Sequence, residues 1–160
     1  MVVSSLALLA SGCTPARTLG LKVQGLSPLN RNEQKQSTPV DMRVYLLRSR
    51  EAFDKASVVD LWNKDQTILE KDLVGACPAM VITILPEEKD HDPRPFDVNL
   101  PEGAGKEARF VGFFVLYGSY AEKLTAKFED GEVERKLVLP FDEAGKVTVR
   151  LTKYGISSES

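Results

Sequence analysis

Short segments with an apolar side chain at every second position are the feature of this sequence that most restricts its fold. In residues 42–48, for example, Met42, Val44 and Leu46 share one face of an extended chain. Such alternation is typical of a β-strand with one buried face. Eight segments have strand character: residues 19–26, 42–48, 79–85, 96–100, 109–117, 123–128, 135–139 and 146–154. Because such strands bury their apolar sides most simply between two packed sheets, we predict a mainly β sandwich of antiparallel sheets.

A segment that is apolar on both faces and a turn dipeptide indicate how some of these strands are arranged. Residues 109–117 are apolar on both faces, which is typical of a central strand that is covered on both sides. Residues 123–128 and 135–139 flank the dipeptide Asp130-Gly131, which is favoured in tight turns. We therefore expect a turn between these two segments.

Residues 49–75 interrupt the strand pattern and have helical spacing. Ser57 is followed three residues later by Asp60, which is typical of a capping box at a helix N-terminus, and Gly75 is a typical helix stop. We predict one or two helices inserted between the second and third strands. The side chains expected to pack against the sandwich are Phe53, Leu61 and Trp62.

The first twelve residues have the character of a bacterial signal peptide. Residues 2–10 are apolar or small, and the run is too short to span a bilayer, which needs about 20 residues. Residues 10–13 resemble a lipobox, although Ala10 stands where leucine is usual. We predict cleavage before Cys13, acylation of Cys13, and a lipidated tether over residues 13–18. The alternative is a buried N-terminal strand that happens to contain a cysteine.

No aspartate follows the cysteine. Because such an aspartate commonly retains lipoproteins in the inner membrane, its absence favours the outer membrane.

Residues 19–160 have the length of one domain with a sizeable core. The chain has 21 basic and 23 acidic residues and no basic stripe of the kind that binds nucleic acid. If Cys13 is acylated, Cys77 has no disulfide partner, and we interpret it as a small buried side chain.

A long polar loop separates the first two predicted strands. It has no large apolar side chain, and its residues are Asn30, Arg31, Asn32, Glu33, Gln34, Lys35, Gln36, Ser37, Thr38 and Pro39. Loops held by a rigid scaffold commonly carry recognition residues, so this loop is the candidate partner-binding site. The alternative is a solvated connection without a binding role.

A second loop, over residues 87–95, is acidic. It contains Glu87, Glu88, Asp90 and Asp92 together with the only histidine, His91. Neighbouring carboxylates can attract calcium, but the ligand pattern of an EF-hand is missing, and we favour a solvated turn. With one imidazole and no nucleophile elbow, phosphate loop or dinucleotide fingerprint, the chain is predicted to be no enzyme and to use no metal or cofactor other than the covalent lipid on Cys13.

Three longer segments follow one another along the chain: RVYLLRSREAFDKASVVDLWNKDQTILEKDLVG, FDVNLPEGAGKEARFVGFFVLYGSY and KVTVRLTKYGIS. In this order and spacing they resemble the TssJ family of type VI secretion lipoproteins. The first of them follows a polar loop that ends in STPV. The likeness covers about residues 19–157. The weak lipobox and the longer acidic loop depart from the family pattern.

The resemblance implies a transthyretin-like sandwich of two four-stranded antiparallel sheets with helical additions. It implies an outer-membrane lipoprotein that faces the periplasm and acts in assembly rather than catalysis. In the family, such proteins bind the periplasmic part of the inner-membrane protein TssM and form a membrane complex with TssM and TssL. The family's loop between the first two strands is implicated in TssM binding, and it corresponds by position to residues 30–39.

These implications lead to specific expectations for the loop. We expect Arg31 to contribute most to binding, because arginine is enriched at interface hot spots. We also expect the whole loop to be replaceable without loss of the fold, since it brings no apolar side chain to the core. The competing hypothesis is a periplasmic module that binds a small ligand, which requires an apolar pocket with a few convergent polar groups.

Overall fold

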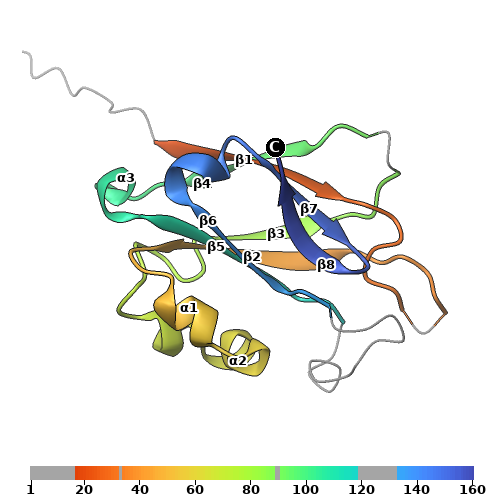
Figure 1. Ribbon diagram of the computed structural model, residues 1–160, viewed down its shortest axis with the longest axis horizontal. Helices are drawn as coiled ribbons and strands as arrows, with labels where there is room; N and C mark the ends of the chain where they lie inside the picture. The colour runs from red at the N-terminus through yellow and green to blue at the C-terminus, as the bar shows by residue number, and fades with distance from the viewer. Residues whose placement is uncertain (1–16, 33, 89–90, 119–132) are drawn as a thin grey trace, which may run out of the picture.

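Two four-stranded sheets packed face to face form the body of the protein (Figure 1). The computed structural model describes residues 17–32, 34–88, 91–118 and 133–160. The strands are β1 (Thr18–Gly25), β2 (Val40–Leu47), β3 (Met80–Ile84), β4 (Arg94–Asn99), β5 (Phe110–Val115), β6 (Lys136–Pro140), β7 (Thr148–Thr152) and β8 (Gly155–Glu159). One sheet has the order β4-β1-β7-β8 and the other the order β3-β2-β5-β6. The predicted mainly β sandwich is confirmed.

The prediction of purely antiparallel sheets is wrong for one of the two. β1 pairs with β4 in antiparallel fashion, but it pairs with β7 in parallel, with Lys22 opposite Thr148 and Gly25 opposite Leu151. The chain leaves β6 through the short helix α4 (Phe141–Ala144), which lies near the end of the sandwich where β1 begins (Figure 1). β7 therefore runs in the same direction as β1. The alternation of side chains shows which face of a strand is buried, but not the direction of its neighbour.

Seven of the eight predicted strand segments correspond to β1 through β7. The segment of residues 123–128 lies outside the described residues. The predicted strand of residues 146–154 ends earlier, because β7 stops at Thr152 and the chain turns into β8. β8 has the sequence GISSE, and its single large apolar side chain gives too little alternation to predict a strand.

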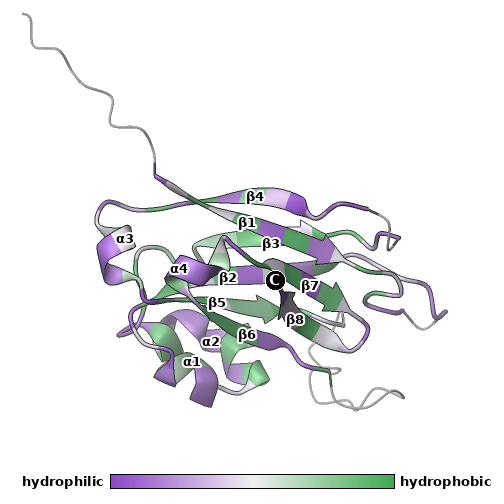
Figure 2. Ribbon diagram, turned by 45° about the horizontal axis from the view of Figure 1, so that its top comes forward, coloured by the Kyte–Doolittle hydropathy of each residue, from purple (hydrophilic) through white to green (hydrophobic). Residues whose placement is uncertain are grey.

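The strand β2 separates two hydrophobic clusters. Met42, Val44 and Leu46 point into the core between the sheets, and each is fully buried. Tyr45 and Leu47 lie on the opposite face, in a second cluster between this sheet and the helices. Figure 2 shows the helices α1 and α2 packed against the sheet that contains β2, β5 and β6. The helical insertion therefore covers the outer face of one sheet.

The insertion consists of α1 (Glu51–Lys55) and α2 (Val58–Leu69), and a short α3 (Ala104–Glu107) precedes β5. Ser57 caps α2 as predicted, because its hydroxyl accepts a hydrogen bond from the Asp60 N–H at 3.0 Å. The predicted stop at Gly75 is wrong. The Leu69 carbonyl accepts hydrogen bonds from the N–H groups of Asp72 and Leu73, and Leu73 pairs with Leu47 of β2. The chain has therefore returned to the sheet before it reaches Gly75.

The side chains predicted to pack on the sandwich do so to different degrees. Phe53 and Leu61 are fully buried in the second cluster. Trp62, which was expected to pack against the sandwich as Phe53 and Leu61 do, is only half-buried. The Arg43 guanidinium lies 5.8 Å from the centre of the Trp62 ring and forms an ion pair with Asp65 at 3.0 Å. Trp62 thus lies at the edge of the cluster, under a polar contact.

Within the described part of the chain, no helix is long and apolar enough to cross a bilayer.

Candidate functional site: the loop end of the sandwich

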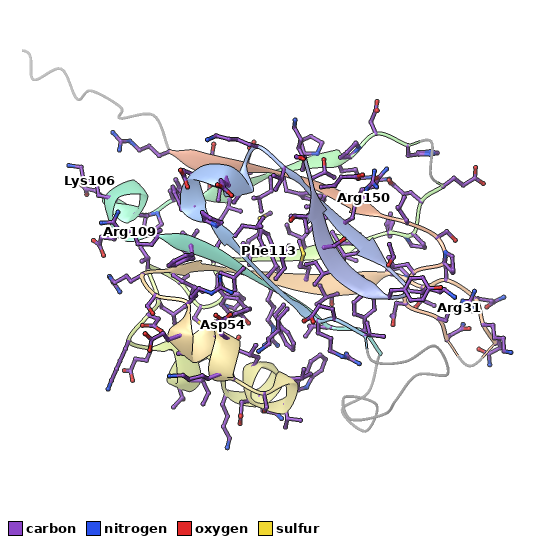
Figure 3. The ribbon with its side chains drawn as sticks, viewed as in Figure 1. Arg31, Asp54, Lys106, Arg109, Phe113 and Arg150 are labelled. Atoms are coloured by element: carbon purple, nitrogen blue, oxygen red, sulfur yellow. The ribbon has the colours of Figure 1, made fainter. Side chains whose placement is uncertain are left out.

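The polar loop of residues 30–39 lies at the end of the sandwich opposite to the start of β1. β1 has eight residues, which span about 25 Å at ~3.3 Å per residue, and the loop follows its far end. Figure 3 shows Arg31 at one extreme of the molecule and Lys106 and Arg109 at the other. We call these the loop end and the tether end. The loop end consists of the described residues in segments 26–39, 85–93, 116–118 and 153–154.

The base of the loop is part of the folded structure. Asn30 is 9% exposed, and its amide nitrogen donates hydrogen bonds to the Thr38 hydroxyl and the Pro39 carbonyl, both at 3.0 Å. Its side-chain oxygen accepts a hydrogen bond from the Gly118 N–H at 2.8 Å. The Thr38 N–H donates to the Asn30 carbonyl at 2.9 Å. The expectation that the whole loop could be replaced without affecting the fold is therefore not supported at its two ends.

The tip of the loop is ordered by one asparagine. The Asn32 side-chain oxygen accepts hydrogen bonds from the N–H groups of Gln34 at 3.0 Å and Gln36 at 2.9 Å. The Asn32 N–H donates to the Gln36 carbonyl at 3.0 Å, and Lys35 has a positive φ of 60°. The tip is thus a closed turn, and a partner that binds it loses little entropy in ordering it.

The structure places the predicted site residues at three levels of exposure. Asn30 is buried, whereas Asn32, Ser37 and Thr38 are half-buried. The exposed residues are Arg31, Gln34, Lys35, Gln36 and Pro39, and Glu33 lies outside the described residues. Two cationic side chains, Arg31 and Lys35, therefore project from the described part of the loop.

The acidic loop lies at the same end and is joined to the start of the polar loop. The Glu87 N–H donates to the Gly25 carbonyl at 2.7 Å, and the Ser27 N–H donates to the Glu87 carbonyl at 2.8 Å. Glu87 also forms an ion pair with Arg94. In the described residues, no three His, Cys, Asp or Glu side chains gather as a metal site would require, and Asp90 lies outside that part of the chain.

Sequence reasoning missed Gln24, which holds the acidic loop in place. Gln24 is 4% exposed; its amide nitrogen donates to the His91 carbonyl at 2.5 Å, and its side-chain oxygen accepts from Arg150 at 3.1 Å. In the sequence it is one of the polar positions of an alternating strand, so nothing there distinguishes it from a solvated residue. His91 itself is exposed, and its N–H donates to the Glu88 carbonyl at 3.2 Å.

Two surface hollows lie beside the C-terminal half of α2. One has a volume of about 440 Å³ and the other about 410 Å³, and Thr67 and Glu70 contribute to both. The second hollow is lined mainly by polar side chains, and the first by polar side chains together with Leu73 and small residues. Neither has the apolar lining that the ligand-binding hypothesis requires. Cys77 lines the first hollow. It is half-buried, whereas the sequence predicted a buried side chain. Partial burial disfavours the thiolate and raises the pKa of the Cys77 thiol to about 11. The thiol is therefore protonated at neutral pH.

Comparison with known proteins decides the family. The family model for "Type VI secretion lipoprotein, VasD, EvfM, TssJ" matches residues 17–152. The chain belongs to the TssJ family of type VI secretion lipoproteins. The resemblance drawn from the three sequence segments is thereby confirmed. A search of curated protein sequences found no significant match.

Several solved structures share the fold of this TssJ family member. The lipoprotein TssJ1 from Pseudomonas aeruginosa has 21% identity and a TM-score of 0.63, with 91% of this chain and 96% of that chain covered. A chain of a type VI membrane complex has 18% identity and a TM-score of 0.65, with 91% and 99% covered. A chain in the structure of the TssM C-terminal domain from EAEC has 19% identity and a TM-score of 0.62, with 89% and 100% covered. At these identities the likeness shows the fold alone.

Proposed function

We propose that this TssJ family protein is a non-enzymatic lipoprotein that anchors the type VI secretion membrane complex to the outer membrane. In this proposal Cys13, which lies outside the described residues, carries the lipid on the periplasmic face of the membrane. The loop end binds the periplasmic domain of TssM, and TssL is reached indirectly through TssM. Family membership and a chain of similar fold in a type VI membrane complex support this assignment. The chain of similar fold in the EAEC TssM structure supports TssM as the partner.

The observation that carries the proposal is the position of the ordered, exposed loop tip. Four residues separate Cys13 from Thr18, so a lipid on Cys13 would hold the tether end near the membrane. The loop tip lies at the opposite end of the molecule, where Figure 3 places Arg31. In this proposal the tip faces the periplasmic space. A protein that reaches from the inner membrane would meet this end first.

The test is a binding measurement that leaves the loop base intact. The full chain, purified in detergent, is immobilised, and the periplasmic domain of TssM from the same organism is the analyte in biolayer interferometry. The tip variant carries Arg31→Ala, Gln34→Ala, Lys35→Gly and Gln36→Ala. It keeps Asn30 and Asn32, and glycine is compatible with the positive φ at position 35.

We expect the wild-type chain to bind and the tip variant to bind at least about tenfold more weakly, with an unchanged melting temperature. The matched control replaces Lys106 and Arg109 at the tether end with alanine and should bind as the wild type does. Equal binding by the tip variant would remove the tip from the interface. Absence of binding by the wild type would refute TssM as the partner.

A further inference from the structure

We infer that the turn between β7 and β8, at Lys153 and Tyr154, is a second contact of the loop end and supplies an aromatic anchor for the same partner. This inference rests on the proposed function and adds to it a contact outside the polar loop. Tyrosine, tryptophan and arginine are the side chains most enriched among residues that dominate binding energy. The turn and the polar loop would thus provide a tyrosine and an arginine to one interface.

Tyr154 is unusually exposed for a large side chain with apolar character. It is 63% exposed, more than Val59, Val81 or Leu85, the other exposed large hydrophobic residues of the described chain. The Lys153 ammonium lies 4.6 Å from the centre of the Tyr154 ring. This contact keeps the ring beside a positive charge at the surface instead of turned into the core.

The backbone that carries Tyr154 is fixed on both sides. The Tyr154 N–H donates to the Thr152 hydroxyl at 3.1 Å, and the Tyr154 carbonyl accepts from the Glu134 N–H at 3.3 Å. Gly155 has a φ of 120°, and a Cβ at this position would lie 2.3 Å from the Glu134 carbonyl oxygen. Since the turn is already ordered, burial of the ring against a partner costs little backbone entropy.

The turn and the polar loop are held by two consecutive residues that follow β5, one residue for each. The Tyr117 hydroxyl donates to the Thr152 carbonyl at 2.9 Å, directly before the turn. The next residue, Gly118, donates its N–H to the Asn30 side chain at the base of the loop. Figures 1 and 2 both show the β7–β8 turn and the polar loop side by side at this end. A single partner face can therefore contact both.

The charges of the loop tip and the turn indicate which side chains a partner surface that contacts them would carry. The loop tip and the turn carry the basic residues Arg31, Lys35 and Lys153. The acidic side chains of this end are Glu134, which is exposed beside the turn, and those of the acidic loop. A complementary TssM face would carry carboxylates around a shallow apolar notch that receives the phenol ring. Such a notch would bury the ring while the hydroxyl group stays hydrogen-bonded at its rim.

The test compares single variants of the full chain in detergent in the same binding measurement. Tyr154→Ala should weaken binding of the TssM periplasmic domain about tenfold, whereas Tyr154→Phe, which keeps the ring, should stay within about twofold of the wild type. Val59→Ala is the matched control, because Val59 is an exposed hydrophobic residue of α2 and not of the loop end. It should bind as the wild type does.

The outcomes separate this inference from the proposed function. Wild-type affinity for Tyr154→Ala, together with weak binding by the loop-tip variant, would overturn the aromatic anchor and leave the proposed function standing. No binding by the wild type would overturn both. If Tyr154→Ala lowers the melting temperature, oxidative footprinting of the wild-type complex decides: protection of Tyr154 supports the anchor, and unchanged oxidation of its ring overturns it.

Discussion

The side-chain oxygen of Asn30 accepts a hydrogen bond from the backbone N–H of Gly118, a residue 88 positions later in the chain, at 2.8 Å. This bond joins the start of the polar loop to the end of β5. It makes the loop base a structural part of the sandwich, while the tip from Arg31 to Gln36 remains available for a partner. The base of the loop thus has a structural role, and the proposed recognition role belongs to the tip.

Replacement of Asn30 should therefore destabilise the protein. Asn30→Ala removes three hydrogen bonds and leaves the Gly118 N–H without this acceptor, so we expect the free energy of unfolding to fall by about 1–3 kcal/mol. Urea denaturation followed by circular dichroism measures the change. Gln34→Ala, at an exposed position of the same loop, is the control and should be nearly neutral. Equal stability of the two variants would mean that the Asn30 bonds are dispensable.

The helical insertion should respond differently at its two aromatic residues. Phe53 is fully buried, so Phe53→Ala should cost about 3–5 kcal/mol. Trp62 is half-buried beneath Arg43, so Trp62→Ala should cost clearly less than Phe53→Ala. Thermal melts of both variants provide the comparison. A larger loss for Trp62→Ala would show that the ring is more deeply buried than the structure places it.

The pH response of Cys77 follows from its raised pKa. Its thiol titrates at about 11 in the folded protein, above the ordinary value of 9.0, because burial disfavours the thiolate. In a Cys13→Ser background, alkylation by iodoacetamide should keep accelerating up to about pH 11. The raised pKa stabilises the fold below about pH 9, and this contribution is lost as the pH rises from 9 to 11. A reaction rate that levels off near pH 9 would contradict the assignment.

The strands and the buried faces could be predicted from the sequence because burial imposes a period of two on the side chains. Met42, Val44 and Leu46 follow this rule and lie in the core. The parallel pairing of β1 with β7 could not be predicted, because it depends on where the chain returns after α4. β8 was missed because an edge strand with polar residues has no one-sided pattern.

The candidate site was only partly predictable for a related reason. The polar composition of residues 30–39 identifies a solvated loop, but not the burial of Asn30, because its partner Gly118 is distant in sequence. The role of Gln24 in holding the acidic loop could not be predicted either, because its partner His91 is also distant in sequence. Tyr154 lies at the end of a segment with strand alternation, and its exposure follows only from the turn at Gly155.

The central claim is that this protein connects a membrane to TssM, and a vesicle flotation assay tests it most directly. Vesicles that carry the acylated chain, with Cys13 as its first residue, are mixed with the periplasmic domain of TssM and floated through a density gradient. The proposal predicts that TssM floats with wild-type vesicles, that Cys13→Ser abolishes flotation of both proteins, and that the loop-tip variant floats without TssM. Failure of TssM to float with vesicles that carry the wild-type chain would contradict the account.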